Sequence, residues 1–176
     1  MYKNLPASTL ELWYTEFMII FINGSINSGK STVSDALVKK LPNTALIEID
    51  SLRDMIGWMP LMESIPINLE NAVSVIRNFV KRNLNVIVAY PLSQKNYDYL
   101  VENLKDLNSK IYAFTLSPKL EKVLTNRGTR NLTDWEKGRI PQQYEKGIHN
   151  PSFGKIIDTS EQTVEETVGV ILEALK

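Results

Sequence analysis

Eight consecutive residues near the start of the chain have the types and spacing of a phosphate-binding loop. They are Gly24, Ser25, Ile26, Asn27, Ser28, Gly29, Lys30 and Ser31. The two glycines permit a tight turn whose N–H groups point at one anion, and Lys30 adds a point charge for the terminal phosphates of a nucleotide. The Ser31 hydroxyl is suited to a Mg²⁺ ion that bridges those phosphates, and Thr32 extends the predicted contact with the nucleotide. The motif therefore predicts a site for a nucleoside triphosphate with Mg²⁺.

The segments on either side of this loop predict the strand and the helix that it needs. Residues 18–22 are uninterruptedly apolar, which is typical of a strand buried on both faces. After the loop, apolar residues recur at helical spacing from Val33 to Leu41, and Pro42 ends the pattern. The helix would therefore begin near Lys30 and turn its positive N-terminal end toward the phosphates.

Strands and helices alternate along the rest of the chain. Further strands are expected at 45–50, 84–90, 111–116 and 154–160, and further helices at 51–56, 69–80, 97–107, 120–124, 133–143 and 164–175. Thr133 and Glu136 form a capping-box pattern, and Pro141 lies inside the helix that it opens. The alternation predicts an α/β fold of three α/β/α layers around a five-stranded parallel sheet.

The length of the chain, 176 residues, favours one domain over residues 18–176. Residues 57–68 contain Pro60 and Pro66 and predict a loop-rich flap, and residues 126–150 predict a small lid. Residues 1–17 show no strong period and are expected to be an N-terminal extension, either an extra helix, a packing arm or a tail. The alternative is that the functional chain begins at Met18.

The charge composition does not favour a long nucleic-acid groove or an anionic membrane surface. Lysine plus arginine and aspartate plus glutamate both number 20, so the formal net charge is zero. The chain has no cysteine, which excludes disulfides and cysteine-ligated metals, and it has a single histidine, His149, which is expected to be a surface or hinge residue. No apolar run approaches the length of a membrane span, so a cytoplasmic location is expected.

The acid at the end of the second predicted strand is the first candidate for catalysis. In an open parallel sheet the ligand lies beyond the carboxyl ends of the strands, and Asp50 is there in position to accept a proton from a substrate hydroxyl. The alternatives are a cap for the following helix or an outer partner of Mg²⁺. Arg53 lies one helical turn further on and is expected to hold the acceptor, unless it forms a surface ion pair with Asp54 or Glu48.

Three arginines of the predicted lid can stabilise the charge of a transferring phosphoryl group. Arg127 and Arg130 lie in a short basic stretch where a lid would close over the nucleotide, and Arg139 has a similar place on the lid helix. Apolar and aromatic residues are expected to line an acceptor pocket, or else to fold onto the core. They are Trp58, Met59, Met62, Tyr90 and Tyr97.

Four segments together resemble the chloramphenicol phosphotransferase-like kinases and, more broadly, the shikimate and gluconate kinase group of P-loop proteins. They read GSINSGKS, IEIDSLRDMI, RGTR and PQQYEKGIHNPSFGKIIDTSEQTVEETV. The resemblance implies ATP with Mg²⁺ as the donor, Asp50 as the catalytic carboxylate, and a place for Asp158 and Thr159 near the adenine. The third strand departs from both groups, because residues 89–92 lack the glycines of a shikimate kinase and the acids of a close chloramphenicol phosphotransferase relative.

These residues favour an ATP-dependent kinase that phosphorylates a hydroxyl of a small molecule, such as an antibiotic or another metabolite. A kinase for the 5′-hydroxyl of a nucleotide or polynucleotide is an alternative, because the spacing of Asp50 and Arg53 also resembles that group. A nucleotide-binding regulatory module with little catalysis is the third hypothesis. The sequence predicts no membrane partner, disfavours nucleic acid, and says nothing of the oligomeric state.

Overall fold

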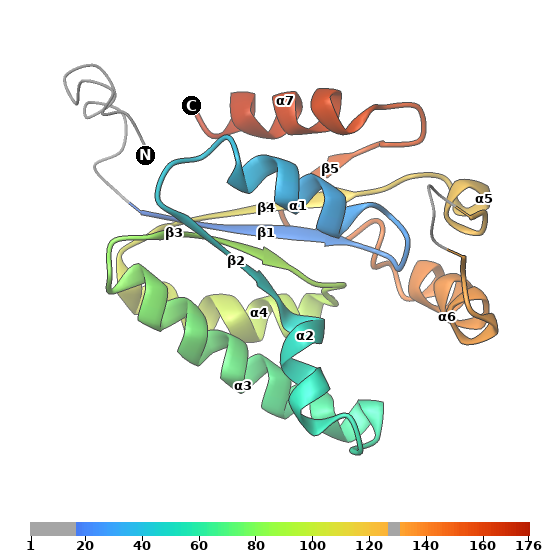
Figure 1. Ribbon diagram of the computed structural model, residues 1–176, viewed down its shortest axis with the longest axis horizontal. Coiled ribbons are helices and arrows are strands. Elements are labelled where there is room, and N and C mark those ends of the chain that lie inside the picture. The colour runs from blue at the N-terminus through green and yellow to red at the C-terminus, as the bar shows by residue number, and fades with distance from the viewer. Residues whose placement is uncertain (1–16, 127–130) are drawn as a thin grey trace, which may run out of the picture.

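Five parallel strands form one sheet in the order β2-β3-β1-β4-β5 (Figure 1). The structure is a computed structural model that describes residues 17–126 and 131–176. The strands are β1 Met18–Gly24, β2 Thr44–Glu48, β3 Asn85–Ala89, β4 Lys110–Leu116 and β5 Lys155–Ile157. The predicted five-stranded parallel sheet is confirmed. Of the predicted extension, all but Phe17 lies outside the described residues.

β1 is the central strand, and its sequence explains why. All seven of its residues are buried, and it pairs in parallel with β3 on one side and β4 on the other. Side chains alternate between the faces of a strand. Ile19 and Phe21 accordingly pack into one apolar core, whereas Ile20 and Ile22 pack into a second core on the opposite face.

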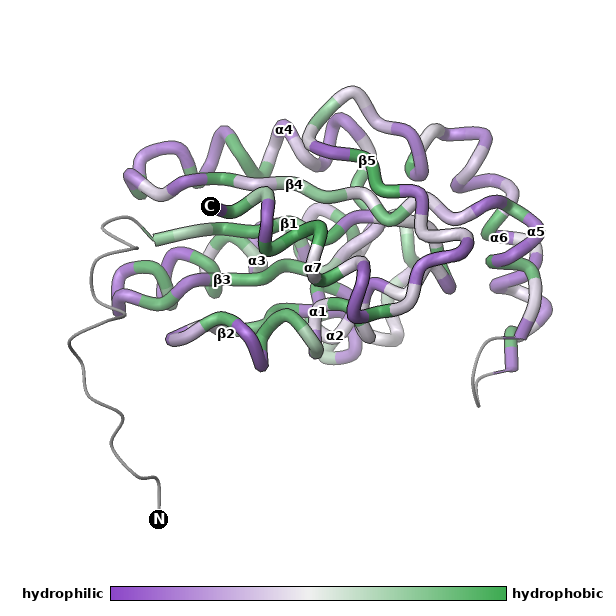
Figure 2. Tube along the Cα trace, turned by 90° about the horizontal axis from the view of Figure 1, so that it is seen from above, coloured by the Kyte–Doolittle hydropathy of each residue, from purple (hydrophilic) through white to green (hydrophobic). Residues whose placement is uncertain are grey.

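Helices cover both faces of the sheet, as predicted. Figure 1 shows α1 and α7 over one face and α3 and α4 over the other, and Figure 2, seen from above, shows the strands side by side with β1 and β3 largely hydrophobic. The helices are α1 Lys30–Val38, α2 Ile49–Arg53, α3 Leu61–Val80, α4 Gln94–Glu102, α5 Leu120–Val123, α6 Asp134–Glu145 and α7 Val164–Ala174, with 3₁₀ turns η1 Asp54–Ile56 and η2 Lys105–Leu107. Among the described residues, no helix combines the length and the apolarity that crossing a bilayer requires.

The loop expected over much of residues 57–68 is wrong, because α3 already begins at Leu61 and contains Pro66. Proline has no N–H, so it removes the one backbone hydrogen bond that the Met62 carbonyl would accept. Further along, α3 buries Leu69 and Ile76 in the core. The burial of this apolar face outweighs the local cost of the proline, because most helix stability in proteins comes from packing.

Candidate active site

The phosphate loop joins the end of β1 to the start of α1, as its sequence predicts. Gly29 is the residue before α1 and has a φ of 95°, and Gly24 has a φ of 148°. A Cβ atom at Gly24 would lie 2.7 Å from the Leu116 carbonyl oxygen and against the Ser28 hydroxyl. The first glycine of the motif is therefore required by the close approach of the loop to β4.

Gly24→Ala is expected to destabilise the fold more than Gly29→Ala. Both substitutions force a side chain onto a positive φ, which costs about 1–2 kcal/mol. Only the alanine at position 24 also meets backbone, since nothing lies within 4 Å of a Cβ at Gly29. Overpacking adds about 1–3 kcal/mol to the loss in free energy of unfolding. Urea denaturation of both variants measures the difference, and equal losses would show that the contact with Leu116 does not matter.

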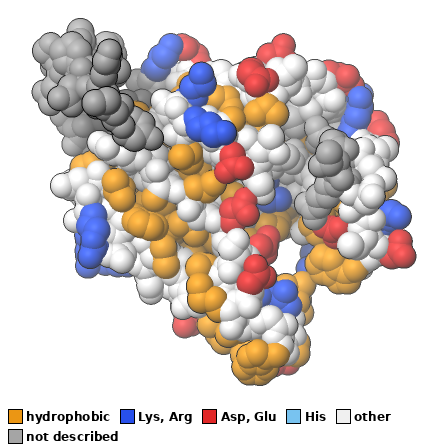
Figure 3. All heavy atoms as spheres, in the orientation of Figure 1, with side chains coloured by type: hydrophobic (Ala, Val, Ile, Leu, Met, Phe, Trp, Pro, Cys, Tyr) orange, Lys and Arg blue, Asp and Glu red, His pale blue; other side chains and the backbone are white. Residues whose placement is uncertain are grey.

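A cavity of about 1200 Å³ opens beside this loop, at the carboxyl ends of the strands. Its walls include residues 26–33 of the loop and α1, together with parts of α2, α3, α4, α6 and the start of α7. Figure 3 shows the surface hollowed between the corner of α2 and α3 and the lid helix α6. The volume exceeds the usual range for one small ligand, about 300–1,000 Å³, so the cavity has room for two reactants.

Lys30 lies within this cavity and folds over the loop. Its Nζ donates a hydrogen bond to the Ser25 carbonyl at 2.8 Å. Ser31 and Thr32 are exposed and line the same cavity, whereas Gly24 and Ser25 are buried behind it. Six of the eight motif residues therefore face the space where phosphates would lie, and the other two shape the turn.

Asp50 lines the cavity, but the element that carries it differs from the prediction. β2 ends at Glu48, and Asp50 lies in the first turn of α2 rather than at the end of a strand. The expected role as a helix cap is wrong, because the residue before α2 is Glu48. The walls of the cavity desolvate the Asp50 carboxyl and raise its pKa, an effect that the positive charge of Lys30 partly opposes.

Arg53 is held in the cavity wall by hydrogen bonds to α3 and its preceding turn. Its Nε donates to the Ser64 hydroxyl at 3.2 Å, and its Nη2 donates to the Met59 carbonyl at 3.4 Å. Among the described residues it forms none of the ion pairs that the sequence left open. The guanidinium is thus positioned by neutral partners, which leaves its charge available to a ligand.

Tyr90 lies between the charged groups of the site. Burial raises the pKa of its phenol to about 12, and the negative charge of Asp50 adds to the shift, whereas Arg139 and Arg53 oppose it. The phenol therefore stays protonated at neutral pH and can donate a hydrogen bond to an acceptor molecule. This agrees with its predicted place in the acceptor pocket.

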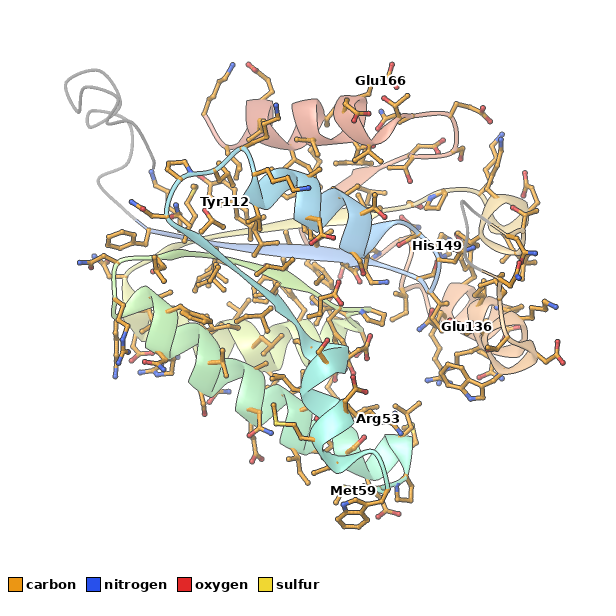
Figure 4. All side chains as sticks on the ribbon, viewed as in Figure 1. Arg53, Met59, Tyr112, Glu136, His149 and Glu166 are labelled. Atoms are coloured by element: carbon orange, nitrogen blue, oxygen red, sulfur yellow. The ribbon has the colours of Figure 1, made fainter. Side chains whose placement is uncertain are left out.

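The lid helix forms the wall opposite α2 and α3. Figure 4 shows Arg53 and Glu136 on these two sides of the cavity. Arg139 lines the cavity, and its Nη1 donates to the Gln142 side chain at 2.9 Å. The predicted capping box of Thr133 and Glu136 is confirmed at the start of this helix. Arg127 and Arg130, the other predicted lid arginines, lie outside the described residues.

Several predicted contacts are not brought to the cavity. Trp58 is 82% exposed and does not line it, so its expected place in the acceptor pocket is wrong. The ring of Tyr97 stacks on the ring of Phe153 in the core, with 3.9 Å between the ring centroids. The Asp158 carboxylate accepts hydrogen bonds from Ser160 and likewise does not line the cavity, whereas Thr159 does.

The Thr159 hydroxyl marks the end of the cavity beside α7. Its Oγ1 is buried and has no hydrogen-bond partner among the described residues. Gln162, Thr163 and Val164 line the cavity next to it. Thr159 therefore lies at the cavity, and the place near an adenine that the resemblance implied for it stays a prediction.

Oxygen atoms suited to Mg²⁺ also line the cavity. They belong to Ser31, Glu48, Asp50 and Asp54. The described part of the chain has no group of three or more acidic or histidine side chains that would hold a metal alone. Mg²⁺ usually keeps several waters and binds one or two protein oxygens together with substrate phosphates. The residues present therefore fit an ion that arrives with a nucleotide.

Sequence reasoning missed most of the lid contribution. Glu136, Gln143 and Lys146 line the cavity together with Arg139, at spacings of three and four residues. Such spacing places them on one face of α6. The signal was present in the sequence as a polar stripe, but Glu136 and Gln143 have no positive charge to suggest phosphate, and Lys146 lies beyond the predicted range 133–143.

Comparison with known proteins supports this description of the fold. The sequence matches no protein-family model and no curated protein. Among solved structures, the tunicamycin resistance protein of Deinococcus radiodurans is 20% identical with a TM-score of 0.68, over 90% of this chain and 95% of that one. A gluconokinase from Sinorhizobium meliloti 1021 is 20% identical with a TM-score of 0.67, over 89% and 90%. The Mycobacterium tuberculosis APS kinase CysC, solved with AMPPNP and APS, is 15% identical with a TM-score of 0.66, over 91% and 98%.

These neighbours confirm the resemblance that the loop and strand-end motifs carried, at the level of architecture. Their structures superpose on this one over most of both chains despite low sequence identity. The chain therefore has the three-layer α/β/α fold of the P-loop kinases, the architecture found in the shikimate and gluconate kinase group.

Proposed function

We propose that this protein is an ATP-dependent kinase that transfers the γ-phosphoryl group to a hydroxyl of a small molecule. The observation that carries the proposal is the meeting of Lys30 and Asp50 in one cavity with room for two reactants. Phosphoryl transfer needs a cation at the phosphates and a group that receives the acceptor proton. The two residues supply these roles from two different elements, Lys30 from the start of α1 and Asp50 from α2.

In the proposed reaction the loop N–H groups and Lys30 hold the β- and γ-phosphates. Mg²⁺, bound through Ser31, would supply charge neutralisation at the same oxygens. Asp50 accepts the proton of the acceptor hydroxyl while the oxygen of that hydroxyl forms a bond to the γ-phosphorus. The bond from that phosphorus to the bridging oxygen breaks, and ADP leaves. Arg139 stabilises the transferring charge, a role that we extend to Arg127 and Arg130.

The acceptor side of the cavity favours a molecule with both polar and apolar parts. Arg53 and the Tyr90 phenol provide polar anchors, and Leu61, Ile65 and Leu69 of α3 provide an apolar wall. Small-molecule sites usually combine a few polar groups with such walls. We therefore propose an antibiotic or another metabolite as the acceptor. The similarity to a tunicamycin resistance protein supports the antibiotic class.

A kinase for the 5′-hydroxyl of a nucleotide or short polynucleotide is the second candidate. Asp50 and Arg53 both line the cavity, and the guanidinium has no acidic partner among the described residues. It is therefore placed to bind a phosphate next to a reacting hydroxyl. The formal net charge of zero restricts this candidate to a short end of the strand rather than a long groove.

ADP formation with a panel of acceptors tests the proposal. Hydroxylated metabolites, antibiotics and 5′-hydroxyl oligonucleotides are supplied with ATP and Mg²⁺ to the wild type, Lys30→Ala and Asp50→Asn. We expect at least one acceptor to raise ADP formation in the wild type alone. ATP binding without stimulation by any class of acceptor would favour the regulatory module. An acceptor response that survives both substitutions would contradict the proposed roles.

The rate should fall in acid with a midpoint above the usual pKa of an aspartate. Asp50 acts as a base only when it is ionised, and burial raises its pKa from the ordinary value of 3.8. Turnover is thus full above the raised pKa and is lost as the pH falls through it. A pH profile of kcat measures this limb, and a profile that stays flat down to pH values near 3.8 would contradict Asp50 as the base.

A further inference from the structure

The carboxamide of Gln143 bridges the lid helix and the phosphate loop. Gln143 lies on α6, is 7% exposed, and lines the cavity. Its Oε1 accepts a hydrogen bond from the backbone N–H of Ile26 at 2.7 Å. Ile26 is the third residue of the phosphate loop, so the lid side chain contacts the part of the protein that would hold the phosphates.

This hydrogen bond determines the positions of Oε1 and Nε2 in the Gln143 carboxamide. A backbone N–H can be accepted only by the oxygen of a carboxamide, so the nitrogen occupies the other position. In the part of the chain that the structure describes, no group accepts a hydrogen bond from Gln143 Nε2. The cavity is thus lined by an oriented donor that is available to a ligand.

Further contacts keep this donor in place over the loop. Asn27, the next loop residue, donates from Nδ2 to the carbonyls of Val123 and Thr125, each at 2.9 Å. The main chain of Gln143 is also anchored, since its carbonyl accepts from the N–H of Ile148 at 3.0 Å. The loop and the base of the lid are therefore joined at two adjacent loop positions. A donor fixed before the ligand arrives needs no reorganisation when charge develops.

We propose that Gln143 Nε2 donates a hydrogen bond to a γ-phosphoryl oxygen of the bound nucleoside triphosphate. The assignment rests on the proposed kinase function and makes Gln143 a catalytic residue of the same site. Lys30 reaches the phosphates from the α1 side of the loop, whereas Gln143 reaches them from α6. A neutral donor there stabilises the oxygens of the group in transfer and leaves the overall charge of the site unchanged.

Measurements of nucleotide affinity distinguish a Gln143 that contacts the γ-phosphate from one that only joins the lid helix to the phosphate loop. Titration calorimetry with Mg²⁺ compares ADP, which has no γ-phosphate, with AMPPNP, which has one. Gln143→Met removes the donor without adding charge. Hydrogen bonds to charged groups contribute about 1.5–3 kcal/mol, so the variant should bind AMPPNP at least about 10-fold more weakly and ADP as the wild type does.

A second variant retains the tether. Gln143→Glu keeps an oxygen for the Ile26 N–H but has no Nε2 donor and adds a negative charge, so it should lose more affinity for AMPPNP than for ADP. Gln94→Met is the matched control, because Gln94 is an exposed glutamine on α4 that does not line the cavity. It should leave both affinities unchanged.

Three results would overturn the inference or its basis. Equal weakening of ADP and AMPPNP by Gln143→Met, with normal binding in Gln143→Glu, would show that the side chain is only a tether. Unchanged binding of both nucleotides in both variants would show that it contacts neither the γ-phosphate nor anything needed for binding. A wild type that binds neither nucleotide would contradict the proposed function itself, and that result is distinct from the first two.

Discussion

Asp50→Asn is expected to lower acceptor-dependent turnover by about 10²- to 10⁴-fold, the range that a positioned general base contributes. The carboxyl lines the cavity with Lys30 and Arg53, and the amide that replaces it has nearly the same shape but cannot take a proton. Affinity for ATP should remain, because the loop supplies most of the contacts with phosphate. Steady-state kinetics and a separate ATP titration measure the two effects.

The stability of the same variant provides an internal check. The folded state raises the pKa of Asp50, so above the usual pKa of 3.8 the native protein holds this proton more tightly than the unfolded chain does. The contribution of the group to stability therefore falls as the pH rises from 3.8 through the raised pKa. Asp50→Asn cannot ionise and should have a melting temperature at neutral pH no lower than that of the wild type.

Asp35→Asn is the matched control for this substitution. Asp35 is an exposed acid on α1 that does not line the cavity, so its loss should leave turnover unchanged. If Asp50→Asn retained wild-type turnover with a bound nucleotide, Asp50 would not be the base. Its other predicted role, as an outer partner of Mg²⁺, would then be tested by the Mg²⁺ concentration that half-saturates the rate.

Lys30→Ala is expected to lower turnover at least about 10²-fold, as the loss of one charge-stabilising donor does in other active sites. It should also weaken ATP binding, because Lys30 is the cation of the loop that faces the cavity. The Lys30 ammonium already makes one hydrogen bond, since its Nζ donates to the Ser25 carbonyl. The ligand must therefore compete with a neutral acceptor, which an anionic phosphate does readily.

Lys39→Ala provides the control for charge. Lys39 is the exposed residue that follows the last turn of α1, far along the helix from the loop, and it does not line the cavity. Its removal lowers the net charge by the same amount and should not change ATP binding. Comparable losses in the two variants would mean that Lys30 acts through the overall charge of the protein rather than through contact with phosphate.

The phosphate loop and the sheet could be predicted because their signals are local. Gly24, Gly29 and Lys30 have the fixed spacing of the motif. The uninterrupted apolar run of β1 indicates a strand that is buried on both faces. Asp50 lines the cavity, but the element that was expected to carry it was wrong. The strand and the short helix α2 meet within two residues, and the apolar Ile49 continues the pattern of β2 into the helix.

The contact between the lid helix and the phosphate loop could not be predicted, because it depends on distant pairing. Gln143 meets Ile26 across 117 positions in sequence, and no local pattern specifies that contact. Trp58 was expected in the acceptor pocket because apolar and aromatic side chains usually line small-molecule sites. The early start of α3 instead leaves it on the exposed corner before that helix. Tertiary packing overrode the proline signal there.

Transfer of a label from γ-labelled ATP to an acceptor is the most direct test of the central claim. The wild type, Lys30→Ala and Asp50→Asn are incubated with Mg²⁺ and the acceptor that stimulates ADP formation most, and the product is separated from the nucleotide. We predict that the label appears on the acceptor hydroxyl with the wild type only. Equal labelling by the wild type and Asp50→Asn, or a wild type that does not bind ATP, would contradict the account.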